Sequence, residues 1–407
     1  MTTTDPCREE KSTPAKQPAE AAEPPIRRLR IAFFSWESLH GVKVGGLAPA
    51  STHLAEQLAR RHEVHFFTRG KGREAFVEGV QYHYCQPDGA NIVDYCRNMG
   101  LLLLDAFRRE DYPPFDILHF HDWHFVEIMH LLRGRSTVLS YHSTEYGRNG
   151  SNFGDWWEFR EISGKEWYGG YIANRVITVS SHTKTEIMWL YNIPEWKITV
   201  APNGIYPERY RMPVDAAAVK RRYGIDPGAP LVLFVGRLVY QKGPDLLIRA
   251  VPLVLLRQPD ARFVVVGDGS MRATLEEEAA GLPVQFLGFV DDARHLELLN
   301  ACDVVAIPSR NEPFGLVLTE AWSAGRCVVA TDVGGLAENI EDFVDGLKVP
   351  VREESIAWAI AHALEDPEMC CRFGSAGRTK VETTFEWGRI ASQVERVYRS
   401  LIQGGEG

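Results

Sequence analysis

Leu29-Arg-Ile-Ala-Phe-Phe-Ser35 is a short apolar run that predicts a buried strand, and it opens the stretch that decides the fold. A loop with three glycines follows at 36–46. Apolar residues at spacings of three and four then predict a helix over 47–61. Glu63-Val-His-Phe-Phe-Thr68 predicts a second strand. A strand, a glycine loop, a helix and a strand in this order are the beginning of a doubly wound α/β domain.

The same pattern returns in the second half of the chain. Runs of Val, Ile and Leu alternate there with helical stretches, as in parallel sheets whose strands are buried on both faces. We therefore expect two tandem Rossmann-like domains, over 28–205 and 206–385, with a linker at 205–229. Ligands bind at the carboxyl ends of such strands, so the interdomain cleft is the expected site. Further strands are expected at 115–120, 137–141, 175–179, 198–204, 231–236, 261–267, 284–288, 304–308 and 327–331.

The composition excludes several functional classes. The 407 residues carry a formal net charge of -9, so a bulk basic surface is absent and no nucleic-acid partner is expected. No apolar run reaches about 18 residues, so we expect no transmembrane segment. The seven cysteines are scattered and form no Cys-x-x-Cys pair, which is typical of reduced thiols in a cytoplasmic protein. Residues 1–27 are rich in Thr, Pro, Ala, Glu and Lys, and we expect a disordered tail.

Two segments that follow predicted strands carry groups that bind anions. In Lys43-Val-Gly-Gly-Leu47 the paired glycines allow backbone N–H groups to approach an anion at a helix N-terminus. A turn that merely needs glycine is the alternative. Arg237 and Lys242 follow the strand predicted at 231–236. Arg can bind a phosphate through two hydrogen bonds, and Lys adds a compact charge, so this second segment favours a phosphate-bearing ligand.

Glu312-Pro-Phe-Gly-Leu-Val-Leu-Thr-Glu320 follows another predicted strand. Gly315 begins an amphipathic helix, so the free amides of its first turn point into the expected cleft. Carboxylates such as Glu312 and Glu320 are good partners for sugar or ribose hydroxyls. They would repel a diphosphate unless Arg237 and Lys242 offset their charge.

Leu118-His-Phe-His-Asp-Trp-His124 holds three histidines and one aspartate within six residues. Such a cluster suggests zinc at first sight, and structural histidines are a second alternative. His119 and His121 would face the same side of a strand, but no further compact set of ligands follows. We therefore expect substrate contact here and no metal site.

Together these motifs resemble the family-4 retaining glycosyltransferases of the GT-B fold, and they are similar to those of glycogen synthases. The resemblance covers residues 29–403, and the spacing of Glu312 and Glu320 is its most specific part. Residues 386–403 resemble the closing helix of that fold, which crosses back onto the first domain. The resemblance thus implies an acceptor domain at 28–205 and a donor domain at 206–385.

The resemblance also implies a role for each matched residue. Glu320 would hold the ribose of a nucleotide, and Glu312 the transferred hexose. Arg237 and Lys242 would neutralise the leaving diphosphate, and His121 would contact the donor sugar near its anomeric carbon. The remaining donor-binding residues would be Lys43, Gly45, Gly46, Asn203, Phe314, Gly315 and Leu316, and the acceptor side His142, Glu145, Tyr146 and Arg148.

The implied activity is transfer of a hexose, glucose in a synthase-like enzyme, from a nucleotide-diphosphate sugar to a carbohydrate or small-molecule hydroxyl. No cofactor or metal is expected, because the cations and the helix N-terminus can neutralise the diphosphate. A sugar-nucleotide epimerase or a phosphorylase on the same fold is one alternative, although no feature marks a lysine for the pyridoxal phosphate that a phosphorylase needs. A non-catalytic sugar-nucleotide-binding protein is another, and the intact set of charged residues argues against it.

Overall fold

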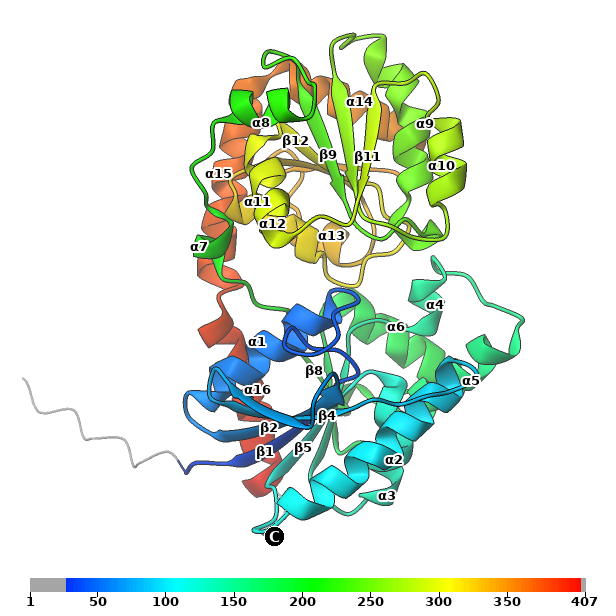
Figure 1. Cartoon of the computed structure of the whole chain (residues 1–407), viewed down its shortest axis with the longest axis vertical. Coiled ribbons are helices and arrows are strands. Elements are labelled where there is room, and N and C mark those ends of the chain that lie inside the picture. The colour runs from blue at the N-terminus through cyan, green and yellow to red at the C-terminus, as the bar shows by residue number, and fades with distance from the viewer. Residues whose placement is uncertain (1–26, 404–407) are drawn as a thin grey trace, which may run out of the picture.

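Each half of the chain winds around its own sheet. The computed structural model describes residues 27–403, and Figure 1 shows the two sheets one above the other, each covered by helices. This is the two-domain α/β architecture with parallel sheets that the sequence predicts. Of the tail expected at 1–27, all but residue 27 lies outside the described part.

The first sheet has eight strands in the order β3-β4-β2-β1-β5-β6-β7-β8. The opening apolar run is β1, which pairs in parallel with β2 and β5, and all but its first residue are buried. Among the described strands only β3 runs antiparallel to its neighbour. The strands are β1 (Arg30–Phe34), β2 (Glu63–Arg69), β3 (Glu74–Val77), β4 (Val80–Cys85), β5 (Ile117–His121), β6 (Thr137–Tyr141), β7 (Arg175–Thr178) and β8 (Ile198–Val200).

The second sheet has six strands, all parallel, in the order β11-β10-β9-β12-β13-β14. Its central strands are mostly apolar and their side chains are buried on both faces, which is why they show no polar alternation. The strands are β9 (Leu231–Val235), β10 (Arg262–Val266), β11 (Val284–Gly288), β12 (Val304–Ile307), β13 (Cys327–Thr331) and β14 (Leu347–Val349).

Helices cover both faces of each sheet. Those that follow strands of the first sheet are α1 (Leu47–Ala59), α2 (Ile92–Glu110), η1 (Trp123–Phe125), α3 (Val126–Leu131), α4 (Glu145–Arg148), α5 (Trp157–Ile172), α6 (Ser181–Tyr191) and η2 (Glu195–Lys197). The rest are α7 (Pro207–Tyr210), α8 (Ala216–Arg222), η3 (Tyr240–Lys242), α9 (Pro244–Leu255), α10 (Arg272–Glu278), α11 (Asp292–Ala301), α12 (Leu316–Ser323), α13 (Gly334–Asn339), α14 (Glu353–Glu365), α15 (Pro367–Thr384) and α16 (Trp387–Gln403).

The chain crosses twice between the domains, and the two crossings lie side by side. Ile205 on the way out donates its amide to Phe385 on the way back, at 2.8 Å. A Cβ at Gly204 would lie 2.3 Å from the indole of Trp387, so glycine is needed there. α16 then packs against α1 in the core of the first domain (Figure 1).

The structure differs from the sequence predictions mainly at sheet edges. All the strands expected from apolar runs are present, with ends that differ by a few residues. The β3–β4 hairpin and the three-residue strand β14 were not predicted, because β3 is half exposed and β14 is too short to form an apolar run. The linker at 205–229 contains α7 and α8.

No helix within residues 27–403 combines the length and the apolar character that crossing a membrane requires.

Candidate functional site

A cavity of about 530 Å³ lies between the domains, where the carboxyl ends of β1, β5 and β6 face those of β9 and β12. Most of the predicted site residues form its wall. Three of the predicted residues, His121, Glu320 and Tyr146, do not line the cavity. Those that line the cavity are Lys43, Gly45, Gly46, His142, Glu145, Arg148, Asn203, Arg237, Lys242, Glu312, Phe314, Gly315 and Leu316.

Lys242 and Glu312 form an ion pair on the second domain's side of the cavity. Lys242 Nζ lies 2.7 Å from Glu312 Oε2, and the Ser309 hydroxyl donates to the same oxygen at 3.3 Å. The two residues follow β9 and β12, which are neighbours in the sheet. Both side chains are largely buried, so each fixes the other at the cavity wall.

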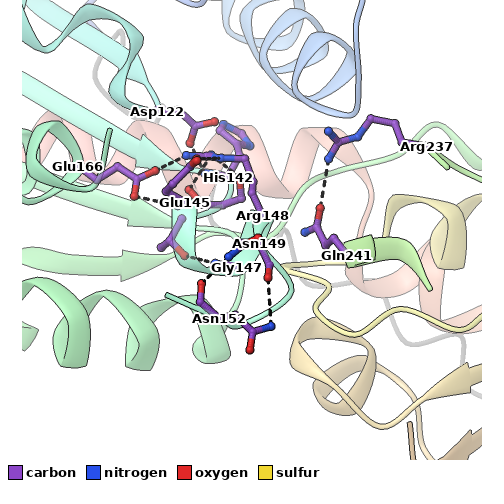
Figure 2. Close-up of polar contacts among 12 residues, drawn as sticks. Asp122, His142, Glu145, Gly147, Arg148, Asn149, Asn152, Glu166, Arg237 and Gln241 are labelled. Carbon is purple, nitrogen blue, oxygen red and sulfur yellow. Dashed lines mark hydrogen bonds and ion pairs between the residues drawn. The ribbon is translucent and has the colours of Figure 1, made fainter. Parts of the chain in front are cut away.

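Arg237 faces the first domain across the cavity. Its guanidinium donates to Gln241 Oε1 at 3.1 Å, and Figure 2 shows it opposite the groups that surround Arg148. The cleft walls desolvate Arg237 and the Arg148 charge repels it, and both effects lower its pKa. Two guanidinium groups that repel each other across an open cavity create a positive potential suited to an anionic ligand.

The loop before α12 presents backbone amides to the cavity. Gly315 has a φ of +100°, which favours glycine, and α12 begins directly after it. A Cβ at Gly335 of α13 would lie 2.5 Å from Phe314 Cα, so α13 packs directly against this loop. The free amides of the first helical turn therefore point at the cavity from a fixed position.

The glycine loop of the first domain already binds a carboxylate. The amides of Val44 and Gly45 donate to Glu37 Oε2 at 2.6 and 2.8 Å. Of the two glycine amides expected to approach a ligand anion, at Gly45 and Gly46, the Gly45 amide is thus occupied by an internal carboxylate. The absence of a side chain at Gly46 lets the two domains approach closely, because a Cβ there would lie 2.7 Å from Leu316 Cδ1 of the other domain.

The histidine-rich segment is placed differently from the expectation. His119 and His121 do face the same side of β5, with ring centroids 4.3 Å apart. His121, expected to contact the donor sugar, is fully buried, and its Nδ1 lies 2.9 Å from His142 Nε2. His142 is therefore the histidine of this pair on the cavity wall. Asp122, whose backbone has a φ of +55° and a ψ of -168°, holds His142 by accepting its amide hydrogen bond at 2.7 Å.

Burial of these histidines predicts a stability that depends on pH. Burial lowers the pKa of His119 to about 3 and lowers the pKa values of His121 and His124 well below the usual range. The neutral forms stabilise the fold above the unfolded pKa of about 6.5, and that contribution is lost as the pH falls below it. We expect the free energy of unfolding to fall by about 1.4 kcal/mol per histidine per pH unit below that value.

Urea unfolding at about pH 7 and about pH 5.5 measures this effect. His119→Asn is the matched variant. Its free energy of unfolding should depend less on pH, by about the contribution of one histidine. An unfolding free energy that does not change between the two pH values would contradict the prediction.

Arg148, which was expected on the acceptor side, belongs to a buried network. It bonds to Glu145 Oε2 at 2.9 Å, to the Ser143 hydroxyl at 2.7 Å and to Glu166, as Figure 2 shows for the two glutamates. Glu166 also accepts the Glu145 amide at 2.9 Å and the Tyr191 hydroxyl. Burial raises the pKa of Glu166 to about 7. The network fixes the head of Arg148, which remains partly exposed at the cavity.

Glu320 lies behind the cavity wall. It accepts a hydrogen bond from the Tyr210 hydroxyl at 3.1 Å and lies 3.7 Å from Nε2 of His295, which does line the cavity. Burial raises the pKa of Glu320. Tyr146 is turned toward Phe153, with ring centroids 4.9 Å apart, and away from the cavity.

Among residues 27–403, one group of potential metal ligands has its atoms within 4.8 Å of one another: His65, His83 and Glu110. His65 Nδ1 lies 3.0 Å from His83 Nε2, a distance that an ordinary N–H···N bond explains. None of the three lines the cavity, so this group takes no part in the site.

Sequence reasoning missed Glu37, Gln241 and Tyr210. Their contacts depend on how loops fold back after strands, which no spacing in the chain encodes. Asp122 could have been found, because it stands in the histidine-rich segment.

Comparison with known proteins identifies both halves of the chain. "Glycosyltransferase Family 4" matches residues 44–209, and "Glycosyl transferases group 1" matches residues 215–380. An uncharacterized glycosyltransferase of Methanocaldococcus jannaschii is 35% identical over 399 residues, which covers 92% of this chain and 99% of the relative. A glycogen synthase of Mycobacterium tuberculosis is 28% identical over 407 residues, which covers 92% and 96%.

Solved structures share the architecture. Sucrose-phosphate synthase from Thermosynechococcus elongatus superposes with a TM-score of 0.79 at 24% identity, over 93% of this chain and all of that one. An Anabaena protein in complex with UDP-glucose superposes with a TM-score of 0.73 at 21% identity, over 92% of this chain and all of that one. At these identities the likeness concerns the fold.

Proposed function

Because this chain belongs to the glycosyltransferases with family 4 and group 1 domains and has the GT-B fold, we propose that it transfers a hexose, first of all glucose, from a nucleotide-diphosphate sugar to an acceptor hydroxyl, with retention of configuration. The second domain, 206–385, binds the donor. The first domain, 28–205, together with 386–403, binds the acceptor. The glycogen synthase relative and the UDP-glucose bound to the Anabaena protein support glucose and a nucleotide donor.

The observation that carries the proposal is the arrangement of Arg237, Lys242 and Glu312 around the N-terminus of α12. Two cations and free amides stand beside a carboxylate that is fixed at 2.7 Å from one of them. The cations and amides match a diphosphate, and the carboxylate matches sugar hydroxyls. These are the two halves of a nucleotide sugar.

The chemical step is a leaving-group problem. The bond between the anomeric carbon and the phosphate oxygen breaks, and its electron pair stays on the diphosphate. Arg237 and Lys242 stabilise that developing charge, which is the largest catalytic contribution in sites of this kind. The acceptor oxygen bonds to the anomeric carbon on the face that the leaving group vacates, and its proton passes to the departing phosphate oxygen.

Transfer should not require a divalent metal. The positive groups of the site already balance the leaving diphosphate, so we expect nucleoside diphosphate release in excess EDTA to stay within about twofold of the untreated rate. Parallel assays with EDTA, with added Mg²⁺ and with neither measure this. Loss of most of the activity in EDTA, recovered by Mg²⁺, would contradict it.

A donor screen tests the proposed function. UDP- and ADP-glucose, and the corresponding galactose and mannose donors, are incubated with glucose, glucose phosphates or maltooligosaccharides, and nucleoside diphosphate release is followed. Release that depends on both donor and acceptor supports transfer. Conversion of the donor sugar without acceptor and without release would identify an epimerase, and binding without turnover a non-catalytic protein.

A further inference from the structure

The carboxylate of Glu338 joins the two domains. Glu338 lies on α13 of the second domain, and α13 contacts α6 of the first domain (Figure 1). It accepts hydrogen bonds from the Ser181 amide at 2.8 and 3.2 Å, from the Ser181 hydroxyl at 3.0 Å and from the His182 amide at 3.2 Å. These residues begin α6, whose first amides lack partners within the helix and form its positive end. A carboxylate is the group they bind best.

The other side of α13 supports the loop that carries Glu312. The Gly335 amide donates to the Glu312 carbonyl at 2.7 Å, and Asn339 Nδ2 donates to the Phe314 carbonyl at 3.1 Å. Gly334 has a φ of +52°, and a Cβ there would lie 2.2 Å from the same Glu312 carbonyl. Because no space separates α13 from this loop, the two move together.

α6 is tied in turn to the acceptor segment. The Thr144 hydroxyl donates to Glu186 Oε1 of α6 at 2.6 Å and accepts the Gly147 amide at 2.9 Å, so it caps α4. α4 includes Arg148. Continuous contacts therefore run from the donor loop through Glu338 and α6 to the acceptor side.

Other described contacts across the cleft involve fewer hydrogen bonds. Lys43 Nζ lies 3.3 Å from Asp292 Oδ1, and both residues are exposed, as Glu338 and Ser181 also are. Asn311 donates to the Ser151 hydroxyl at 2.9 Å through one bond. Glu338 makes four such contacts and combines them with the charge of a helix end.

We propose that Glu338 is a positioning residue for sugar transfer, which holds the donor loop opposite the acceptor segment by capping α6. The inference rests on the proposed function. Arg237 and Lys242 share a domain with Glu338, so nucleotide binding does not need the contact between Glu338 and α6. Transfer does, because it needs the reacting groups of both domains in register.

Two single variants disrupt the contact between Glu338 and α6, one at the acceptor and one at a donor. Glu338→Ala removes the acceptor. Ser181→Pro removes the amide and the hydroxyl of Ser181, at the first position of a helix, where proline is tolerated. Ser180 before it is already extended, with φ -159° and ψ 162°, as a residue before proline must be.

We expect each variant to lower kcat about fivefold to tenfold, and to leave the Kd of the nucleoside diphosphate within about twofold. The double variant should be no slower than either single one, because both remove the same contact. Glu338→Gln keeps an acceptor oxygen and should recover part of the rate. Glu277→Ala, at an exposed glutamate of α10, is the matched control and should equal the wild type.

Hydrogen exchange separates this inference from the proposed function. The Ser181 and His182 amides should exchange slowly in the wild type and about tenfold faster in Glu338→Ala, whether or not a sugar is transferred. Protected amides in a wild type without transfer activity would overturn the proposed function and, with it, the positioning role of Glu338. Unprotected amides, an unchanged kcat, or losses that add in the double variant would overturn the inference itself.

Discussion

Replacing Lys242 with alanine is expected to lower kcat for sugar transfer by about two to three orders of magnitude. Lys242 is the cation fixed at 2.7 Å from Glu312, and the proposed reaction requires its ammonium group beside the charge that develops on the leaving diphosphate. A preorganised donor of this kind contributes mainly in the transition state, so kcat should fall more than KM rises. Initial rates of nucleoside diphosphate release at saturating donor and acceptor measure the change.

The control and the coupling to Glu312 sharpen this test. Lys71→Ala removes an exposed lysine of the β2–β3 loop and should leave the rate unchanged. Glu312→Gln combined with Lys242→Ala should cost less than the sum of the two single losses, because each variant already disrupts the pair. A Lys242→Ala enzyme with a kcat within about twofold of the wild type would contradict the assignment of Lys242 to the leaving group.

Replacing Arg148 with methionine is expected to lower the free energy of unfolding by about 3–5 kcal/mol. The substitution leaves Glu166, whose side chain is 1% exposed, without its cationic partner in the interior. Glu166 then keeps the Glu145 amide and the Tyr191 hydroxyl as donors, but no opposing charge. Urea unfolding followed by circular dichroism measures the loss.

The companion variant Glu166→Gln shows where the loss comes from. In the Arg148→Met background it removes a carboxyl that must either stay ionised without a partner or take up a proton, so the double variant should be more stable than Arg148→Met alone. Losses that simply add, or an Arg148→Met protein within about 0.5 kcal/mol of the wild type, would contradict the buried ion pair as the cause.

The fold was predictable because buried parallel strands leave a strong mark in the chain. β9 and β10 are mostly Val, Leu and Phe, β13 is a short run of small and apolar residues, and the predicted ranges lie within two residues of the observed ones. The β3–β4 hairpin left no such mark, since half of β3 faces solvent. Propensity alone does not separate an exposed edge strand from a loop.

The proximity of Lys242 and Glu312 was predictable for a topological reason. Lys242 and Glu312 are far apart in the chain, but each follows a strand, and β9 and β12 are neighbours in the sheet. The positions of His121 and Glu37 were not predictable in this way. Whether a side chain at a strand end reaches the cavity depends on the residues in front of it, such as His142, and on the path of the next loop.

The most direct test of the central claim is the configuration of the product. Proton NMR of a reaction with an α-linked nucleotide-diphosphate glucose reports the new glycosidic bond, while phosphorus NMR counts the nucleoside diphosphate released. We predict one equivalent of nucleoside diphosphate per α-linked product, formed only when acceptor is present, and a loss of both signals in Lys242→Ala. A β-linked product, or release that is unaffected by Lys242→Ala, would contradict the account.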